Sequence, residues 1–228
     1  MAPAQRKEIE TIVRDYLLKN PEVLREALIE LQRREKAEEE ASRAKITSDP
    51  QSPLFVSENH AVVGTPQGKI TVVEFFDYNC GYCKRALDDL VRLIKVEPEL
   101  KVILKDFPVL GPGSVEAAKI AQAAKRQLKG DRFFEFHAKL LGVRGQVGKA
   151  QALAAAKELG VDMDRLAKDA ESDAVREGIE ETMRIGDSLG ISGTPAYVVG
   201  KEVVVGAVGF DKLKTRVANV GKCGEATC

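Results

Sequence analysis

The sequence lacks three features that would place it in other classes of protein. It has no net charge, because 35 Lys and Arg side chains balance 35 Asp and Glu side chains, so no global field attracts nucleic acid or an anionic membrane. It has no apolar run long enough to span a bilayer, and its N-terminus lacks the apolar segment of a signal peptide. We therefore expect a soluble protein with no nucleic-acid partner.

Cysteine and histidine are scarce, with four of the first and two of the second. A zinc site needs four ligands, and the only sulfurs besides Cys80 and Cys83 are Cys223 and Cys228, at the far end of the chain. Structural zinc is therefore disfavoured, and the two isolated histidines are expected to be surface or packing residues. For Cys223 and Cys228 we expect a local disulfide in the tail, with a redox or metal role as the alternative.

The most informative stretch runs from residue 70 to residue 94. An apolar segment, residues 70–76, predicts a buried strand, and apolar positions at helical spacing from Cys83 onward predict an amphipathic helix. Asp77 or Asn79 is the expected cap of that helix. Cys80 then lies where unpaired N–H groups and the helix dipole favour an anion such as a thiolate.

This geometry predicts a redox-active pair, in which Cys80 and Cys83 alternate between a dithiol and a disulfide. Cys80 is expected to be the nucleophile and Cys83, one helical turn later, the resolving thiol; an inert buried pair is the alternative. Glu74 lies within the apolar strand, where a carboxylate is costly unless it is paired. Paired with Lys105 on the next strand, it would relay the proton of Cys83; the alternative is that both side chains face solvent.

Residues 1–45 are predicted to form a helical arm. They are rich in Glu, Arg, Lys, Leu and Ala, and Asn20-Pro21-Glu22 marks the start of a second helix within them. The apolar stripe of these helices must be buried, either on copies of the same chain or on the body of this chain. Residues 46–53, with Asp, Ser and Pro, look like a linker, which favours self-association through residues 6–45.

The remaining chain predicts an α/β domain over residues 54–220. Segments 54–56 and 61–63 suggest a short strand or hairpin, residues 101–105 a strand parallel to 70–76, and residues 196–205 a hairpin around Gly200-Lys201. Between these strands, residues 109–190 are largely helical, and residues 221–228 form a tail. The order is β-α-β, a helical block, then β-β-α.

Three motifs carry a specific resemblance: residues 73–83, Lys105-Asp106-Phe107-Pro108, and Gly193-Thr194-Pro195-Ala196. With them, the sequence resembles the DsbA group of the thioredoxin superfamily, in which a helical domain is inserted into a thioredoxin fold. The resemblance implies a cis bond at Thr194-Pro195 facing the cysteines, and a substrate-binding surface formed by Thr194, Pro195, Gly81 and Tyr82. Where the family's strongest oxidant has Pro-His, this chain has Gly81-Tyr82, so we expect a weaker oxidant.

The helical arm narrows the resemblance to ScsC-type proteins, which are oligomeric disulfide isomerases associated with copper tolerance. This implies a periplasmic homo-oligomer, a trimer, whose signal peptide has been removed. It also implies misfolded or reduced secreted proteins as substrates and a membrane-bound redox partner that keeps the Cys80–Cys83 pair reduced. No cofactor is required, although the same two thiolates are a candidate copper(I) site. The competing functions are a monomeric dithiol oxidase and a copper(I)-binding module.

Overall fold

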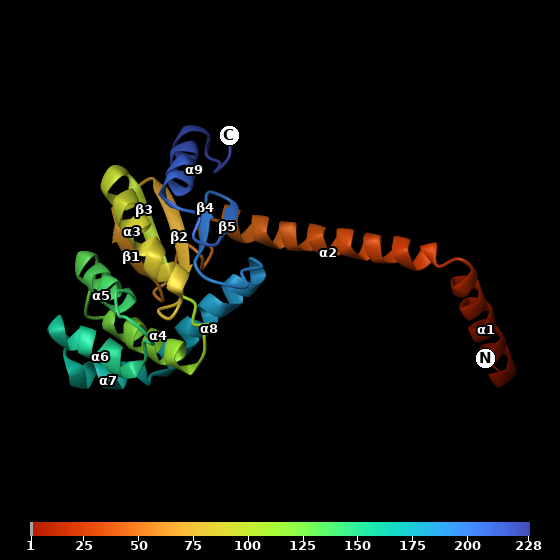
Figure 1. The fold of residues 1–228 in the computed structure, drawn as a ribbon, viewed down its shortest axis with the longest axis horizontal. Helices are drawn as coiled ribbons and strands as arrows, with labels where there is room; N and C mark the ends of the chain where they lie inside the picture. The colour runs from red at the N-terminus through yellow and green to blue at the C-terminus, as the bar shows by residue number, and fades with distance from the viewer. Residues whose placement is uncertain (1) are drawn as a thin grey trace. The chain divides into compact units, whose positions relative to one another are not determined.

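The computed structural model describes residues 2–228, which form nine α-helices and five β-strands (Figure 1). Met1, the first residue of the predicted arm, lies outside the described residues. The elements are, in chain order, α1 (Pro3–Lys19), α2 (Glu22–Ser48), β1 (Ala61–Gly64), β2 (Ile70–Phe76), α3 (Gly81–Val96), β3 (Leu100–Asp106), α4 (Pro112–Ala124), α5 (Asp131–Leu141), α6 (Lys149–Glu158), α7 (Met163–Ala170), α8 (Asp173–Ser188), β4 (Ala196–Val199), β5 (Glu202–Val205) and α9 (Phe210–Cys223). No helix among residues 2–228 is long and apolar enough to cross a membrane.

The strands form one mixed sheet in the order β1-β3-β2-β4-β5. β2 and β3 are parallel because α3 connects them, and every other neighbouring pair is antiparallel. This confirms the predicted β-α-β unit and the closing hairpin. One expectation was wrong: residues 54–56 form a turn rather than a strand, since the Phe55 N–H donates to the Ser52 carbonyl at 2.8 Å, while the Leu54 side chain is fully buried.

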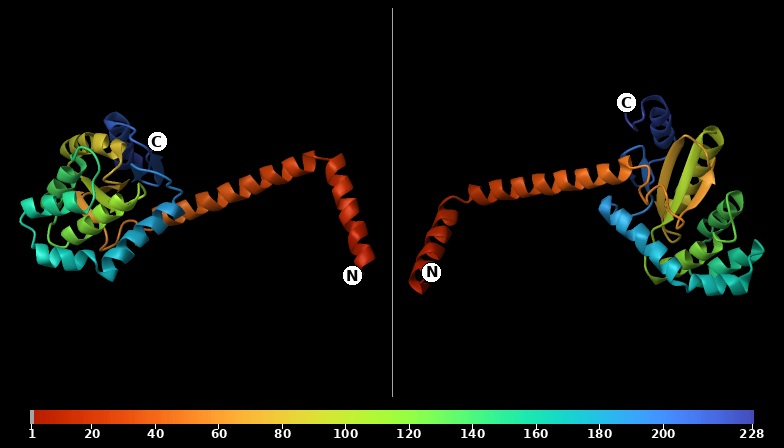
Figure 2. Two further views of the ribbon diagram at one scale, coloured as in Figure 1. Left: turned by 60° about the horizontal axis from the view of Figure 1, so that its bottom comes forward. Right: turned by 180° about the vertical axis from the view of Figure 1, so that it is seen from behind.

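Both faces of the sheet are buried, because helices cover them. Val72 and Phe76 of β2 pack with α3, α9 and the inserted helices, whereas Val73 and Phe75 pack with the end of α8. The side chains of a strand alternate between its two faces, so a continuous apolar run is the pattern that such a doubly covered strand requires. In the view of Figure 1, α3 lies in front of the sheet, and the view from behind in Figure 2 shows the opposite face of the sheet.

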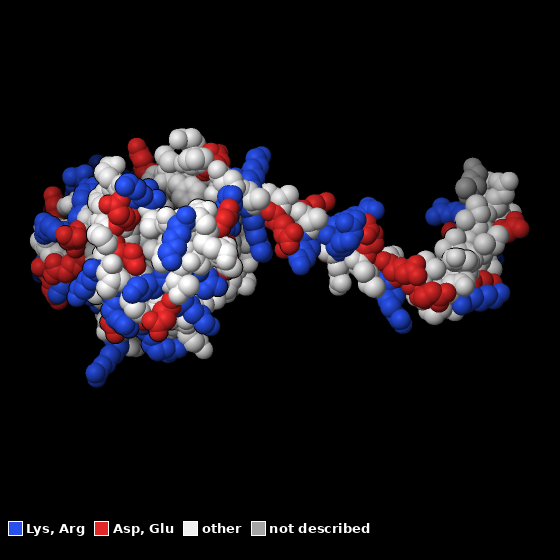
Figure 3. Space-filling model, turned by 90° about the horizontal axis from the view of Figure 1, so that it is seen from above, with Lys and Arg blue, Asp and Glu red and all other residues white. Residues whose placement is uncertain are grey.

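Helices α4 to α8 follow β3 and precede β4, as the predicted helical insertion at residues 109–190 requires. They surround a core of small and aromatic side chains that includes Ala117, Ala121, Phe133 and Phe136. Charged side chains of both signs are interspersed over the face of the globular part of the chain shown in Figure 3, in keeping with the zero net charge of the chain.

The chain divides into two compact units, one ending at Ser42 and the other comprising Arg43–Cys228. In the first unit, α1 has no buried residue. Large apolar side chains on α1 and α2 are exposed, from 48% for Ile9 to 69% for Leu18. They comprise Ile9, Ile12, Val13, Tyr16, Leu18, Leu24, Leu28, Ile29 and Leu31, and we call them the apolar arm residues.

The boundary between arm and body differs from the predicted one. α2 continues to Ser48, so the first three residues of the predicted linker are helical. Thr47 and Ser52 are buried, and Ile46 packs against the apolar cluster around Leu54. Residues 46–53 therefore belong structurally to the second unit, where they cover one edge of its core.

Candidate active site

The site is built where β2 ends and α3 begins. Cys80 is the N-cap residue of α3, with extended backbone dihedral angles, and Cys83 lies in the first turn. Both cysteines are free thiols, so the pair is in its dithiol form. Cys80 is 6% exposed and Cys83 is 1% exposed, which leaves Cys80 as the more accessible sulfur. As expected, Cys80 lies at the positive end of the helix dipole.

The expected caps, Asp77 and Asn79, do not cap this helix, which has no side-chain cap hydrogen bond. The Asp77 carboxylate makes other hydrogen bonds instead. It accepts them from the Asn79 N–H at 2.8 Å, the Ser114 hydroxyl at 2.7 Å and the Leu110 N–H at 3.0 Å. Asp77 thus ties the loop before Cys80 to the segment that follows β3 and to the start of α4.

Asn79 attaches the same loop to the helical insertion. Its Nδ2 donates to the Ser114 hydroxyl at 3.0 Å and to the Val147 carbonyl at 2.8 Å, and its Oδ1 accepts from the Val147 N–H at 2.7 Å. Lys84 of α3 adds bonds from Nζ to the carbonyls of Val143 and Gly145. These contacts hold the backbone on both sides of Cys80 in one position against the insertion.

Thr194 and Pro195 face the cysteines from the start of β4. The Thr194–Pro195 peptide bond is cis, as the resemblance implied. The Cys80 thiol donates to the Thr194 carbonyl at an Sγ to O distance of 3.1 Å, although the two residues are 114 positions apart. The Thr194 side chain lies close enough to the Cys83 thiol to favour its ionised form. Pro195 is buried, and its carbonyl accepts from the Gly206 N–H at 2.8 Å.

Glu74 lies beneath Cys83 on the same face of the sheet. Its carboxyl group is buried beside the Tyr197 hydroxyl, its registered neighbour on β4, and neither Glu74 Oε2 nor the Tyr197 oxygen has a hydrogen-bond partner of normal geometry within residues 2–228. Burial therefore raises the pKa of Glu74 to about 8. Burial, and secondly the charge of Glu74, raise the pKa of the Cys83 thiol well above its usual range.

Lys105 is not the partner of Glu74, which corrects the sequence-based hypothesis. In the β2–β3 register Glu74 is opposite Leu104, and Lys105 is opposite Phe75. Lys105 therefore points to the other face of the sheet, because adjacent residues of a strand face opposite sides. There its Nζ donates to the Pro53 carbonyl at 2.9 Å, and burial lowers its pKa to about 8. The alternative of two solvent-facing side chains is also wrong, since both are buried.

The surface around Cys80 is exposed and partly apolar. Tyr82 is 60% exposed, with the Arg85 guanidinium 4.4 Å above its ring, and Gly81 is exposed beside it. Leu110 is exposed in the loop that hydrogen-bonds to Asp77. An apolar rim of this kind suits contact with an unfolded peptide.

The remaining sequence candidates lie away from this centre. Cys223 and Cys228 form a disulfide. His137 is fully buried and packs edge-on against Phe76, and burial lowers its pKa to about 3, so it has a packing role. His60 is partly buried in the loop before β1. Within residues 2–228, no group of three or more His, Cys, Asp or Glu side chains is arranged to hold a metal ion.

Three residues of the site were missed or misassigned from the sequence: Asn79 as an anchor, Ser114, and Tyr197 beside Glu74. Their roles depend on segments that meet only in the folded chain. The polar residue directly before the first cysteine, Asn79, is the one signal in the sequence, and its position predicts a helix cap rather than an anchor.

Comparisons with known proteins agree with this geometry. The family model described as "DSBA-like thioredoxin domain" matches residues 71–218, and the model described as "Copper resistance protein ScsC N-terminal domain" matches residues 5–38. The crystal structure of a thioredoxin-like oxidoreductase from Silicibacter pomeroyi is 35% identical, with a TM-score of 0.69, covering 79% of this chain and 98% of that one.

Proteus mirabilis ScsC in a compact conformation is 28% identical over 95% of this chain and 98% of its own, with a TM-score of 0.72. A curated relative, the Na(+)/H(+) antiporter NhaA 1 of Salinispora arenicola, is 27% identical over 73% of this chain, which spans only 25% of that relative's length. Since the first family model covers most of β2, both active-site cysteines and the cis-Pro195 segment that faces them, this chain belongs to the DsbA-like thioredoxin family.

Proposed function

We propose that this protein is a homo-oligomeric disulfide isomerase that acts on misfolded secreted proteins in the periplasm. One observation carries the proposal: the same chain has a domain with a Cys80–Cys83 dithiol and two helices, α1 and α2, whose apolar arm residues are exposed. Apolar stripes of that size are stabilised by burial against other helices. A match of residues 5–38 to the ScsC N-terminal domain supports self-association there, and a trimer is the expected state.

The proposed chemistry starts with the Cys80 thiolate, which attacks one sulfur of a wrong substrate disulfide. A mixed disulfide forms and a substrate thiolate leaves. In isomerisation, that or another substrate thiolate attacks a different substrate sulfur, and the rearranged substrate finally releases Cys80. When rearrangement fails, Cys83 loses its proton, attacks the Cys80 sulfur and releases a reduced substrate. The enzyme then holds a Cys80–Cys83 disulfide, which a membrane-bound redox partner must reduce.

Glu74 is proposed to take the Cys83 proton. Its charge raises the pKa of that thiol. With a pKa of about 8, the ionised carboxylate that accepts the proton is a minor form of Glu74 at pH 7 and the main form above pH 8. The Thr194 N–H, which donates to no backbone carbonyl within residues 2–228, would pair with an extended substrate segment laid over Cys80. The exposed Gly81, Tyr82 and Leu110 would contact its side chains.

The arm accounts for isomerase rather than oxidase activity. Several sites held around a shared space would retain a substrate by repeated weak contacts, and their crowding would exclude a large oxidising partner. The disulfide between Cys223 and Cys228 is consistent with an oxidising compartment.

The test is the removal of residues 1–42. This cut preserves Arg43 and Thr47, which belong to the second unit. The truncated chain should be a monomer by light scattering, should lose isomerase activity on scrambled ribonuclease, and should keep or gain oxidase activity on reduced ribonuclease. Replacing Leu24, Leu28 and Leu31 together by Asp should have the same effect, whereas Lys36→Asp on the same helix should have none. A truncated chain that stays oligomeric, or isomerises as fast as the full chain, would favour the monomeric dithiol oxidase.

A second candidate function is copper(I) binding, favoured by the match of residues 5–38 to a copper resistance protein domain. Two thiols one helical turn apart suit a soft ion. Cys80 and Cys83 would hold copper(I) as cargo, and their oxidation would release it. The reduced protein should compete with a chromogenic chelator for about one copper(I) per chain, and Cys80→Ser with Cys83→Ser should abolish that competition. Binding that survives the double substitution would exclude this site.

A further inference from the structure

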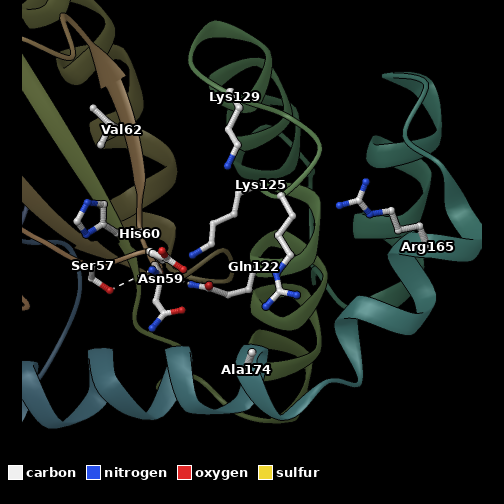
Figure 4. Close-up of a pocket in the computed structure, with 11 residues that line it drawn as sticks. Ser57, Asn59, His60, Val62, Gln122, Lys125, Lys129, Arg165 and Ala174 are labelled. Atoms are coloured by element: carbon white, nitrogen blue, oxygen red, sulfur yellow. Dashed lines mark hydrogen bonds between the residues drawn. The ribbon is translucent and has the colours of Figure 1, made fainter.

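A cavity of about 680 Å³ lies on the second unit, away from the cysteines. Its walls come from the segment Ser57–His60, Val62 of β1, the end of α4 with the segment that follows it, and one residue each of α7 and α8. Figure 4 shows the Lys125 side chain reaching from the end of α4 toward Asn59, with Lys129 next to it and Arg165 on the α7 side. Cavities of roughly 300–1,000 Å³ are typical of small-molecule sites.

Lys125 is the unusual member of this lining. It is only 6% exposed, and its Nζ is buried without a hydrogen-bond partner among the described residues. An ammonium group carries three donors, and its burial is costly when they are unused. Burial accordingly lowers the pKa of Lys125 to about 7. The fold therefore holds a desolvated amino group at the cavity, one that titrates near neutral pH and whose hydrogen-bonding capacity is unused.

The charge of Asp106 acts on Lys125, but no hydrogen bond joins the two side chains. Asp106 Oδ2 accepts from the Gln122 amide at 2.8 Å, and Oδ1 has no partner within residues 2–228. Gln122 also donates to the Asn59 carbonyl at 2.9 Å, which fixes the floor of the cavity.

Further cations line the opening. Lys129 forms no ion pair with the described residues, while Arg126 and Arg165 share one carboxylate, Asp169, at 3.7 and 3.5 Å. Glu58 is the one carboxylate in the lining itself. The electrostatic potential is also positive at His60, at the edge of the cavity. Burial, and then the charges of Lys105, Lys125 and Lys101, lower the pKa of His60 to about 3.

We propose that this cavity binds a small molecule through an oxyanion, a phosphate or sulfate group, which accepts hydrogen bonds from the Lys125 ammonium at the base and from Lys129 at the rim. Hydrogen bonds between an ammonium group and a charged oxyanion are stronger than hydrogen bonds between neutral groups. The remaining volume would receive the rest of the ligand. The site is separate from thiol exchange and does not depend on the isomerase proposal.

The test is a calorimetric titration of the full-length reduced protein with inorganic phosphate at constant ionic strength. A titration with chloride serves as the control. Lys125→Met, which keeps the length of the side chain and removes its charge, should weaken phosphate binding by about 10- to 100-fold. Lys129→Gln should weaken it by a smaller factor. Lys119→Gln, on the same helix but outside the cavity, should bind phosphate like the native protein.

Circular dichroism and the rate of thiol exchange check that each variant is folded. If Lys125→Met does not fold, the Lys129→Gln and Arg165→Gln double variant decides the question, because both side chains are exposed. Native protein that does not bind phosphate at tens of millimolar would overturn the proposal. So would binding that is equally strong in Lys125→Met, or that is lost equally in Lys119→Gln.

Discussion

Glu74→Gln should make the protein more stable, by an amount that grows with pH. In the native state, burial raises the pKa of Glu74 from 4.5 to about 8. The unfolded chain therefore loses this proton near pH 4.5, while the native protein keeps it up to about pH 8. Because the native state binds more protons across this window, its stability falls as pH rises from about 4.5 to 8. Gln has no proton to lose, so the variant escapes that fall.

The size of the effect follows from the width of the window. Each pH unit between the two pKa values changes the free energy of unfolding by about 1.4 kcal/mol. The free energy of unfolding of the variant should equal that of the native protein at pH 4, exceed it by about 3 kcal/mol at pH 7, and exceed it by a constant amount of about 5 kcal/mol above pH 8. Urea unfolding of both reduced proteins at each pH measures the difference.

The exposed Glu177 on α8 provides a matched control. Glu177→Gln should change the free energy of unfolding by less than about 0.5 kcal/mol at every pH. A Glu74→Gln gain that did not vary with pH, or a loss of stability at pH 8, would refute the assignment of a buried protonated carboxyl. The same variant should resolve mixed disulfides about 100-fold more slowly, because the acceptor for the Cys83 proton is gone. Stopped-flow measurement with a peptide disulfide separates this loss from stability.

Three further predictions concern the surroundings of the site. Asn79→Ala should lower the free energy of unfolding by about 2–3 kcal/mol, measured in urea, because two buried backbone groups of Val147 lose their partner. Lys105→Met should leave the rate of mixed-disulfide resolution unchanged in stopped-flow assays, since Lys105 faces the opposite side of the sheet from Glu74. A slower rate would show that Lys105 does take part in transfer of the Cys83 proton. Replacing Cys223 and Cys228 by Ser should cost about 2 kcal/mol in urea unfolding, the loop entropy of so short a crosslink, with no change in thiol exchange.

Local patterns were sufficient to predict much of this protein. The apolar run of residues 70–76, followed by two cysteines at helical spacing, predicted the strand, the helix and the position of Cys80 at their junction. These features depend on residues close in the chain, whose periodicity and dipole act over a few positions. The order of elements and the helical insertion followed for the same reason.

The tertiary structure alone decided which distant groups meet. Whether Glu74 could reach Lys105 depended on the register of β2 against β3, where a shift of one residue moves a side chain to the other face. The Cys80 contact with Thr194, across 114 positions, follows from the pairing of β2 with β4. The Asn79 contacts with Val147, across 68 positions, arise from packing of the insertion against the loop before α3. The Lys125 cavity likewise joins segments that share no local pattern, because burial and charge pairing are properties of the assembled chain rather than of any one stretch.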